Sequence, residues 1–226
     1  MKHAKSNSLS TRGQRRKIFH KRYLLMILCI LLLGSFLTYF KECQFLYHVE
    51  NGAMILNHYH CQQDYLTVNR YSRPGIQLKK VNGIVIHYTA NRGSRALNNR
   101  SYFENLRLTH QTSASSHFII DQDGTILQII PLNEIAYASN ARNKDTISIE
   151  CCYNESDGRF TRATYRTLIA LVKALMDHYH LTSDDVIRHY DVTGKLCPLY
   201  FVENPREWML FKKRLDGWNI LGFLYL

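Results

Sequence analysis

The sequence predicts an α/β domain with a central mixed β-sheet flanked by helices, preceded by one membrane-spanning helix. Three observations support this prediction. Short runs of β-branched and apolar residues, such as 81–88 (VNGIVIHY), alternate along the chain with segments of helical periodicity, such as 161–179. This alternation is typical of α/β folds. An uncharged stretch of 18 residues, 23–40, comes before all of them and has the length of a membrane span.

The first 22 residues carry eight Lys or Arg and no acidic residue. Removing these eight charges from the formal net charge of +11 leaves +3 for the rest of the chain. A nucleic-acid-binding protein needs its basic residues clustered on the folded domain, so we expect no nucleic-acid partner. By the positive-inside rule, residues 1–22 stay in the cytoplasm, 23–40 form a single-pass anchor, and the rest lies outside the cell membrane.

Two other interpretations compete with the anchor. A cleaved signal peptide has a shorter apolar run and a small-residue cleavage site, and no clear Ala-x-Ala site follows residues 23–40. A helix of a soluble core would have a polar face, and this segment has none.

Residues 41–70 mix aromatic residues, His and Gln without a sustained period, and we expect them to form a stalk. Cys43 and Cys61 fall in this segment, and an extracellular location permits them to pair. Cys151 and Cys152 are neighbours in a strand-like run, so their side chains point to opposite faces. We expect both to be small core residues rather than a bridge.

The folded domain is expected over 71–215, and it begins at a turn-rich segment that contains Pro74 and Gly75. Its predicted elements, in chain order, are a strand over 81–88, a helix over 94–108, a hairpin of 117–121 and 125–130, a strand over 146–153, a helix over 161–179, a strand over 186–190 and a helix from Asn204. Thr161 is the expected N-cap of the clearest helix. Asn204 followed by Pro205 is typical of a helix start. Residues 216–226 form an apolar tail that we leave unassigned.

Three residues suited to metal binding lie at strand ends or in loops. His87 ends the first buried strand, His189 ends the last one, and Cys197 follows eight residues later. Zinc favours imidazole and thiolate ligands, and catalytic zinc sites use three protein ligands plus water. Taken singly, each has an ordinary explanation as a structural His or a packed Cys. Spacing alone therefore leaves a zinc site and a structural role about equally supported.

Five segments together resemble a known family, the type 2 N-acetylmuramoyl-L-alanine amidases, which include phage amidase-type lysozymes and are related to the peptidoglycan-recognition proteins. The segments are 83–89 (GIVIHYT), 115–120 (SSHFII), 123–125 (DGT), 145–150 (DTISIE) and 188–198 (RHYDVTGKLCP). They occur in the family's order, and the resemblance covers roughly residues 71–215.

The resemblance implies a site and a reaction. His87, His189 and Cys197 would bind Zn²⁺, and Glu150 and Lys195 would assist catalysis. The substrate would be peptidoglycan, cut between N-acetylmuramic acid and L-alanine. In such a site Glu150 would act as general base and acid, and Lys195 would stabilise the oxyanion. We expect the protein to act as a monomer.

One position departs from part of the family. The phage lysozymes carry a Tyr just before the residue that matches His117, and this chain has Ser116 there. A phenol at this position is therefore not the catalytic hydroxyl, which favours a carboxylate, Glu150. His117, Asn140 and Arg142 are further candidates for substrate contact, together with Asn143. A structural role for His117, and a solvated loop around the other three, are the alternatives.

Two other classes of function remain for comparison. A zinc-free peptidoglycan-binding module would be expected to have lost a ligand, often the third, whereas Cys197 is present. A zinc peptidase of another class would be expected to carry a His-Glu-x-x-His helix, which this sequence lacks. The enzyme is the favoured interpretation.

Overall fold

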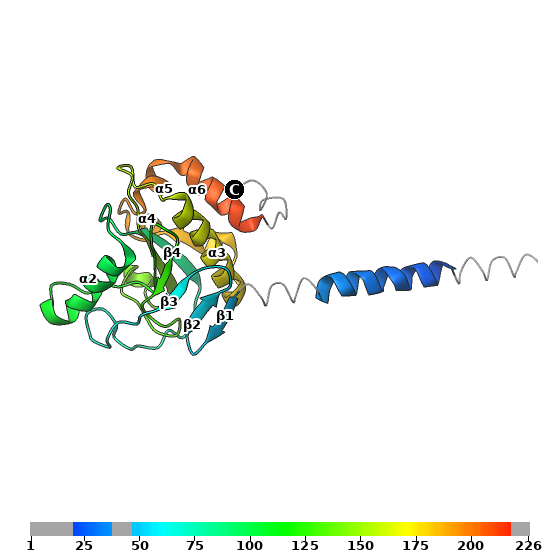
Figure 1. The fold of residues 1–226 in the computed structure, drawn as a ribbon, viewed down its shortest axis with the longest axis horizontal. Coiled ribbons are helices and arrows are strands. Elements are labelled where there is room, and N and C mark those ends of the chain that lie inside the picture. The colour runs from blue at the N-terminus through cyan, green and yellow to red at the C-terminus, as the bar shows by residue number, and fades with distance from the viewer. Residues whose placement is uncertain (1–19, 38–46, 218–226) are drawn as a thin grey trace, which may run out of the picture. The chain divides into compact units, whose positions relative to one another are not determined.

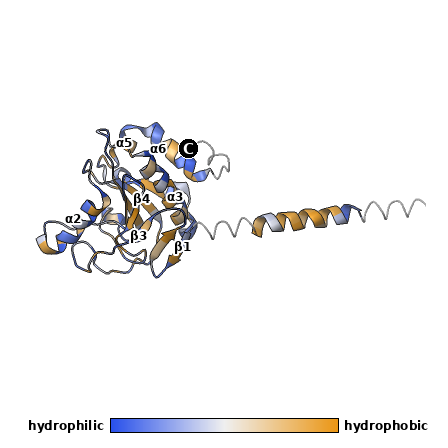
Figure 2. Cartoon of the chain, viewed as in Figure 1, coloured by the Kyte–Doolittle hydropathy of each residue, from blue (hydrophilic) through white to orange (hydrophobic). Residues whose placement is uncertain are grey.

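The computed structural model describes residues 20–37 and 47–217, which belong to two separate units, 1–45 and 46–226. The first unit contains the helix His20–Leu37, which is long and apolar enough to cross a membrane. Apolar residues cover it nearly all round (Figure 2). An N-terminal signal sequence can be equally long and apolar. The predicted basic segment falls largely on residues 1–19, and the end of the predicted span falls on 38–40, both outside the described residues.

The second unit is built on a mixed sheet of six strands within residues 47–217 (Figure 1). In spatial order the strands are β3 (Cys61–Gln63), β6 (Ile126–Gln128), β5 (Phe118–Ile120), β7 (Thr146–Cys151), β4 (Gly83–Tyr88) and β8 (Val186–Arg188). β5 and β6 pair antiparallel, as the predicted hairpin requires, and the other neighbours pair parallel. The predicted α/β class with a central mixed sheet is confirmed.

Helices cover both faces of this sheet. Helices α3 (Arg162–Tyr179) and α6 (Pro205–Asp216) pack on one face, against a core that includes Ile84, Ile86 and Ile149. Helix α2 (Ala96–Thr109) packs on the other face, against Ile119 and Leu127. The remaining helical segments are short: η1 (Asn140–Arg142), η2 (Ser183–Asp185), α4 (His189–Thr193) and α5 (Leu199–Glu203). Cys151 and Cys152 enter the two opposite cores, as their adjacent strand positions predict.

Local sequence signals explain the helix starts. The hydroxyl of Thr161 accepts a hydrogen bond from the backbone N–H of Thr164 at 3.0 Å, so Thr161 is the predicted N-cap of α3. α6 begins at Pro205, as predicted. The strand predicted over 186–190 is shorter, because the chain turns into α4 at His189. The tail prediction falls mostly on residues 218–226, outside the described part of the chain.

The prediction of a stalk over 41–70 is wrong for residues 47–70. Strands β1 (Tyr47–Glu50) and β2 (Ala53–Leu56) form a hairpin, and β3 joins the sheet by pairing with β6. The turn residues Asn51 and Gly52 both have positive φ, the conformation that a two-residue hairpin loop needs. Cys61 is a free thiol whose Sγ donates to the carbonyl of Met54 at 3.1 Å. Its suggested partner, Cys43, lies outside the described residues.

Candidate metal centre and active site

The candidate site lies where β4, β7 and β8 end. These strands are parallel neighbours, so their carboxyl ends meet at one edge of the sheet. His87 on β4 and Glu150 on β7 are register partners, and their side chains therefore lie on the same face. His189 is the first residue of α4, directly after β8. Sheet pairing thus brings together residues that are far apart in the sequence.

His87, His189 and Cys197 form a compact trio of potential metal ligands. Their ligand atoms all lie within 4.8 Å of one another, and all three residues are buried. Nδ1 of His87 is 3.8 Å from Sγ of Cys197, and the two imidazole rings are 4.5 Å apart between centroids. The structure therefore gathers the three residues that the sequence singled out, in an arrangement that can hold a metal ion.

The chemistry of the trio fits a metal such as zinc. Nε2 of His189 is buried and has no hydrogen-bond partner among residues 20–37 and 47–217, which is a costly state for an isolated polar atom. Burial lowers the pKa of His87 and of His189, with the neighbouring charges of His189 and Lys195 acting in the same direction. Both rings are thereby kept neutral, the form that binds metal. Two imidazoles and one thiolate are a ligand set that zinc favours.

Burial acts in the opposite direction on the acidic groups of the site. It raises the pKa of the Cys197 thiol, and the nearby Glu150 carboxylate adds to this effect. It also raises the pKa of Glu150 to about 8. Oε2 of Glu150 is buried and makes no hydrogen bond within the described chain. Glu150 can therefore hold a proton at neutral pH and has an oxygen available for a new partner.

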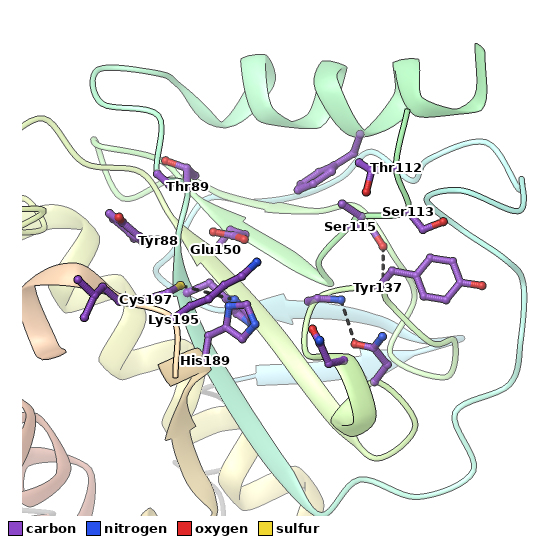
Figure 3. A pocket seen from close by; sticks show the side chains of 18 residues that line it. Tyr88, Thr89, Thr112, Ser113, Ser115, Tyr137, Glu150, His189, Lys195 and Cys197 are labelled. Atoms are coloured by element: carbon purple, nitrogen blue, oxygen red, sulfur yellow. Dashed lines mark hydrogen bonds between the residues drawn. The ribbon is translucent and has the colours of Figure 1, made fainter. Parts of the chain in front are cut away.

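These residues border a cavity of about 550 Å³. Figure 3 shows Glu150, His189, Lys195 and Cys197 gathered on one side of it. Lys195 is exposed and follows Gly194, the left-handed residue that ends α4. The ammonium of Lys195 is therefore the cation that this wall offers to a molecule in the cavity.

The opposite side of the cavity carries polar, uncharged side chains, among them Thr112, Ser113, Ser115 and Tyr137 (Figure 3). Asn140 and Asn143, two of the predicted substrate-contact residues, also line the cavity. The lining further includes the apolar residues Phe103, Ala114 and Ala138. Residues 112–114 and Tyr137 were not predicted, because no periodicity or motif distinguishes them from an ordinary loop, and Ser115 lies in a family-like segment but was given no role.

Two predicted contact residues lie away from the cavity. His117 is fully buried, and both of its ring nitrogens are occupied: Nδ1 accepts from the backbone N–H of Ser148 at 3.0 Å, and Nε2 lies 2.9 Å from the carbonyl oxygen of Glu134. Arg142 pairs with Asp145 at 2.8 Å and lies beside Gly83, at the other end of β4. The structure thus favours a structural role for both residues.

Ser116, at the position where phage lysozymes carry a Tyr, also faces away from the cavity. It is fully buried, and its hydroxyl donates to the backbone carbonyl of Phe118 at 3.0 Å. This position therefore presents no hydroxyl to the cavity, whereas Glu150, the register partner of His87, is a carboxylate that lines it.

Comparisons with known proteins agree with this geometry. The family model described as N-acetylmuramoyl-L-alanine amidase matches residues 77–199. The N-acetylmuramoyl-L-alanine amidase CwlL of Bacillus licheniformis is 36% identical over 173 residues, which is 71% of this chain and 47% of that protein. BlyA of Bacillus subtilis (strain 168) is 37% identical over 174 residues, 68% of this chain and 46% of that protein. The chain thus spans about half the length of these relatives.

Solved structures show the same fold. The catalytic domain of XlyA is 30% identical with a TM-score of 0.59, and the match covers 69% of this chain and 99% of that domain. PlyL, at 24% identity, has a TM-score of 0.60 over 73% of this chain and all of its own length, and it supports the fold alone. The family model covers more than half of the chain and includes His87, His189 and Glu150 as well as Cys197. The chain therefore belongs to the N-acetylmuramoyl-L-alanine amidase family whose domain it carries at residues 77–199.

Proposed function

We propose that this protein is a zinc-dependent amidase that hydrolyses the bond between N-acetylmuramic acid and L-alanine in peptidoglycan. The observation that carries the proposal is the ligand trio His87, His189 and Cys197 beside Glu150, in one cavity and inside the matched family segment. Bound zinc would supply a Lewis acid for amide hydrolysis.

Glu150 is the proposed general base and acid. Amide hydrolysis needs a group that removes a proton from the attacking water and returns one to the leaving amine. Glu150 lines the cavity, its Oε2 has no hydrogen-bond partner among the described residues, and the raised pKa allows the carboxyl to hold the proton between the two steps. The carboxylate thus does not need to exchange its proton with bulk solvent during a turnover.

Lys195 and the polar side chains of the cavity are proposed to act on the substrate. The Lys195 ammonium can stabilise negative charge that develops on the amide oxygen, as a point charge at the cavity edge. The hydroxyls and amides that line the cavity, including Ser113 and Asn140, suit a substrate rich in sugar hydroxyls and peptide groups.

The proposed location is the outer side of a bacterial cell membrane. The helix His20–Leu37 would anchor the chain, and the basic residues before it would stay in the cytoplasm. This orientation gives the domain access to peptidoglycan. Protease added to spheroplasts should digest the domain and spare an N-terminal tag, and protection of the domain would contradict the orientation.

The activity is tested on the 226-residue chain purified in mild detergent. We expect about one zinc per chain by metal analysis, and release of free L-alanine amino termini from muropeptides. Peptidoglycan binding without cleavage by the zinc-loaded protein would instead support a binding module. A folded chain that takes up no zinc would overturn the metal assignment.

A further inference from the structure

A buried serine lies directly behind one of the three candidate ligands. Ser139 is fully buried, and its hydroxyl oxygen is 3.2 Å from Nε2 of His87. The side chain is absent from the cavity lining, which includes its neighbours Ala138 and Asn140. Ser139 therefore does not reach a molecule in the cavity, and any effect it has on the reaction passes through His87.

The two nitrogens of the His87 ring face different partners. Nδ1 lies on the side of the trio, 3.8 Å from Sγ of Cys197, and Nε2 faces Ser139. A neutral imidazole has one donor and one acceptor nitrogen. If Nδ1 gives its lone pair to a metal, the proton must be on Nε2, and the Ser139 oxygen accepts it. Such an outer hydrogen bond fixes the ring orientation and strengthens the ligand.

The position of Ser139 is itself held by Asn143. Oδ1 of Asn143 accepts the backbone N–H groups of both Ala138 and Ser139, at 3.0 and 2.5 Å. The backbone N–H of Arg142 donates to the carbonyl of Ser139 at 2.9 Å, which closes the turn. Without the Asn143 side chain, two backbone donors at the start of η1 would lose their acceptor.

The same turn also touches the second histidine-bearing element. η1 packs against α4, the helix that begins with His189. The Nε2 atom of His189, in contrast to that of His87, has no protein partner within the described ranges. Ser139 thus contacts the ring of His87, whereas η1 packs against the element that carries His189.

We propose that Ser139 and Asn143 are positioning residues that hold His87 in the orientation and tautomer required for metal binding. Asn143 fixes the Ser139 backbone, and the Ser139 hydroxyl fixes the His87 ring. This inference rests on the proposed function, because it assumes that the trio binds a metal. It also gives Asn143, which lines the cavity, a role that does not depend on substrate contact.

Zinc affinity of the purified 226-residue chain, measured by competition with a chromophoric chelator, tests the inference. Ser139→Ala is expected to weaken zinc binding about 10–100-fold, the usual effect of removing such a support. Ser148→Ala is the matched control, because the Ser148 hydroxyl also contacts a buried ring, that of His117, at 3.1 Å. Zinc affinity should be unchanged in the Ser148 variant, although both variants lose thermal stability.

A second pair of variants covers the case in which Ser139→Ala does not fold. Asn143→Ala removes the acceptor for the two backbone N–H groups and should weaken zinc binding. Asn143→Asp keeps an acceptor oxygen and should retain parental affinity. Parental affinity in Ser139→Ala or Asn143→Ala, or an equal loss in Ser148→Ala, overturns the inference while leaving the amidase proposal intact. A parent that binds no zinc overturns both, and a parent that binds zinc without cleaving muropeptides overturns the amidase proposal alone.

Discussion

Two buried histidines lie beside opposite edges of strand β7, and their surroundings differ. His87 sits on β4, and His117 precedes β5, the other neighbour of β7. Both contact a serine through one ring nitrogen. The second nitrogen of His117 meets the backbone carbonyl of Glu134 at 2.9 Å, whereas the second nitrogen of His87 faces Cys197 and His189.

The difference teaches how to distinguish a structural histidine from a ligand when both are buried. A ring whose two nitrogens are satisfied by the protein has no capacity left for a metal or a substrate. A ring with one nitrogen turned toward other unpartnered donors has that capacity. Burial lowers the pKa of both residues, and for His117 the value is about 4, so the pKa alone does not separate the two roles.

The largest expected effect comes from removing His87. His87→Ala takes away one of three proposed ligands, so tight zinc binding should be lost and turnover should fall roughly 10³-fold or more, as for removal of other essential groups. Metal analysis and a muropeptide assay on the same sample measure both quantities. His117→Ala is the control and should keep its zinc. Zinc retention by the His87 variant would place the metal elsewhere.

The second-largest effect concerns strand β7. Its Ser148 contacts the ring of His117, and its Glu150 is the register partner of His87. Glu150→Gln preserves the shape of the side chain but cannot take a proton. Turnover should fall by roughly 10²–10⁴-fold while zinc content stays at the parental level. If kcat with muropeptide substrate stays near the parental value, Glu150 is a structural residue like Ser148.

The third effect is on stability rather than activity. His117→Ala leaves the N–H of Ser148 and the carbonyl of Glu134 without their ring partners and opens a void in a fully buried position. The free energy of unfolding should drop by roughly 2–4 kcal/mol. Urea unfolding of the metal-free protein measures this loss. A smaller loss than that of His87→Ala under the same conditions would reverse the assignment of structural and ligand roles.

The smallest effect is the pH dependence of that stability. The folded-state pKa of His117 is about 4, below its ordinary value, so between pH 6.5 and 4 the unfolded chain binds a proton that the folded chain does not. Stability is therefore lost as pH falls through this window, by about 2 kcal/mol at pH 5. His117→Gln removes this contribution, and the other buried histidines are common to both proteins. Unfolding curves at pH 7.5 and 5 should show a larger acid loss in the parent than in the variant, and equal losses would contradict the buried, neutral ring.

The sequence predicts most of the sheet from local patterns, whereas the metal trio is predicted through the resemblance to the amidase family. The run at 83–88 and the helix at 162–179 are long and periodic. The catalytic and metal-binding roles themselves remain proposals. The assignment of residues 47–70 failed although Asn51-Gly52, a common hairpin turn, lies between two apolar segments. Strands of three or four residues carry too little pattern to be recognised singly.

The supporting contacts of the site could not be predicted in the same way. Ser139 and His87 are 52 residues apart, and no period or spacing relates a serine in a polar loop to a histidine on a strand. Likewise, His117 and His87 both follow the pattern of a His beside an apolar strand. Only the tertiary arrangement shows which ring nitrogens are already occupied.

The buried amide of Gln128 has a consequence for hydrogen exchange. Its Oε1 accepts the backbone N–H of Met54 at 2.8 Å, and its Nε2 donates to the carbonyl of Gly52 at 2.7 Å. This side chain fastens the β1–β2 hairpin to β6 of the six-stranded sheet, so the hairpin should open only together with the sheet. The Met54 amide is then expected to exchange with deuterium as slowly as amides of β7. Shortened versions of the protein that begin at Tyr71 would therefore lose part of a cooperative folding unit, not merely a spacer.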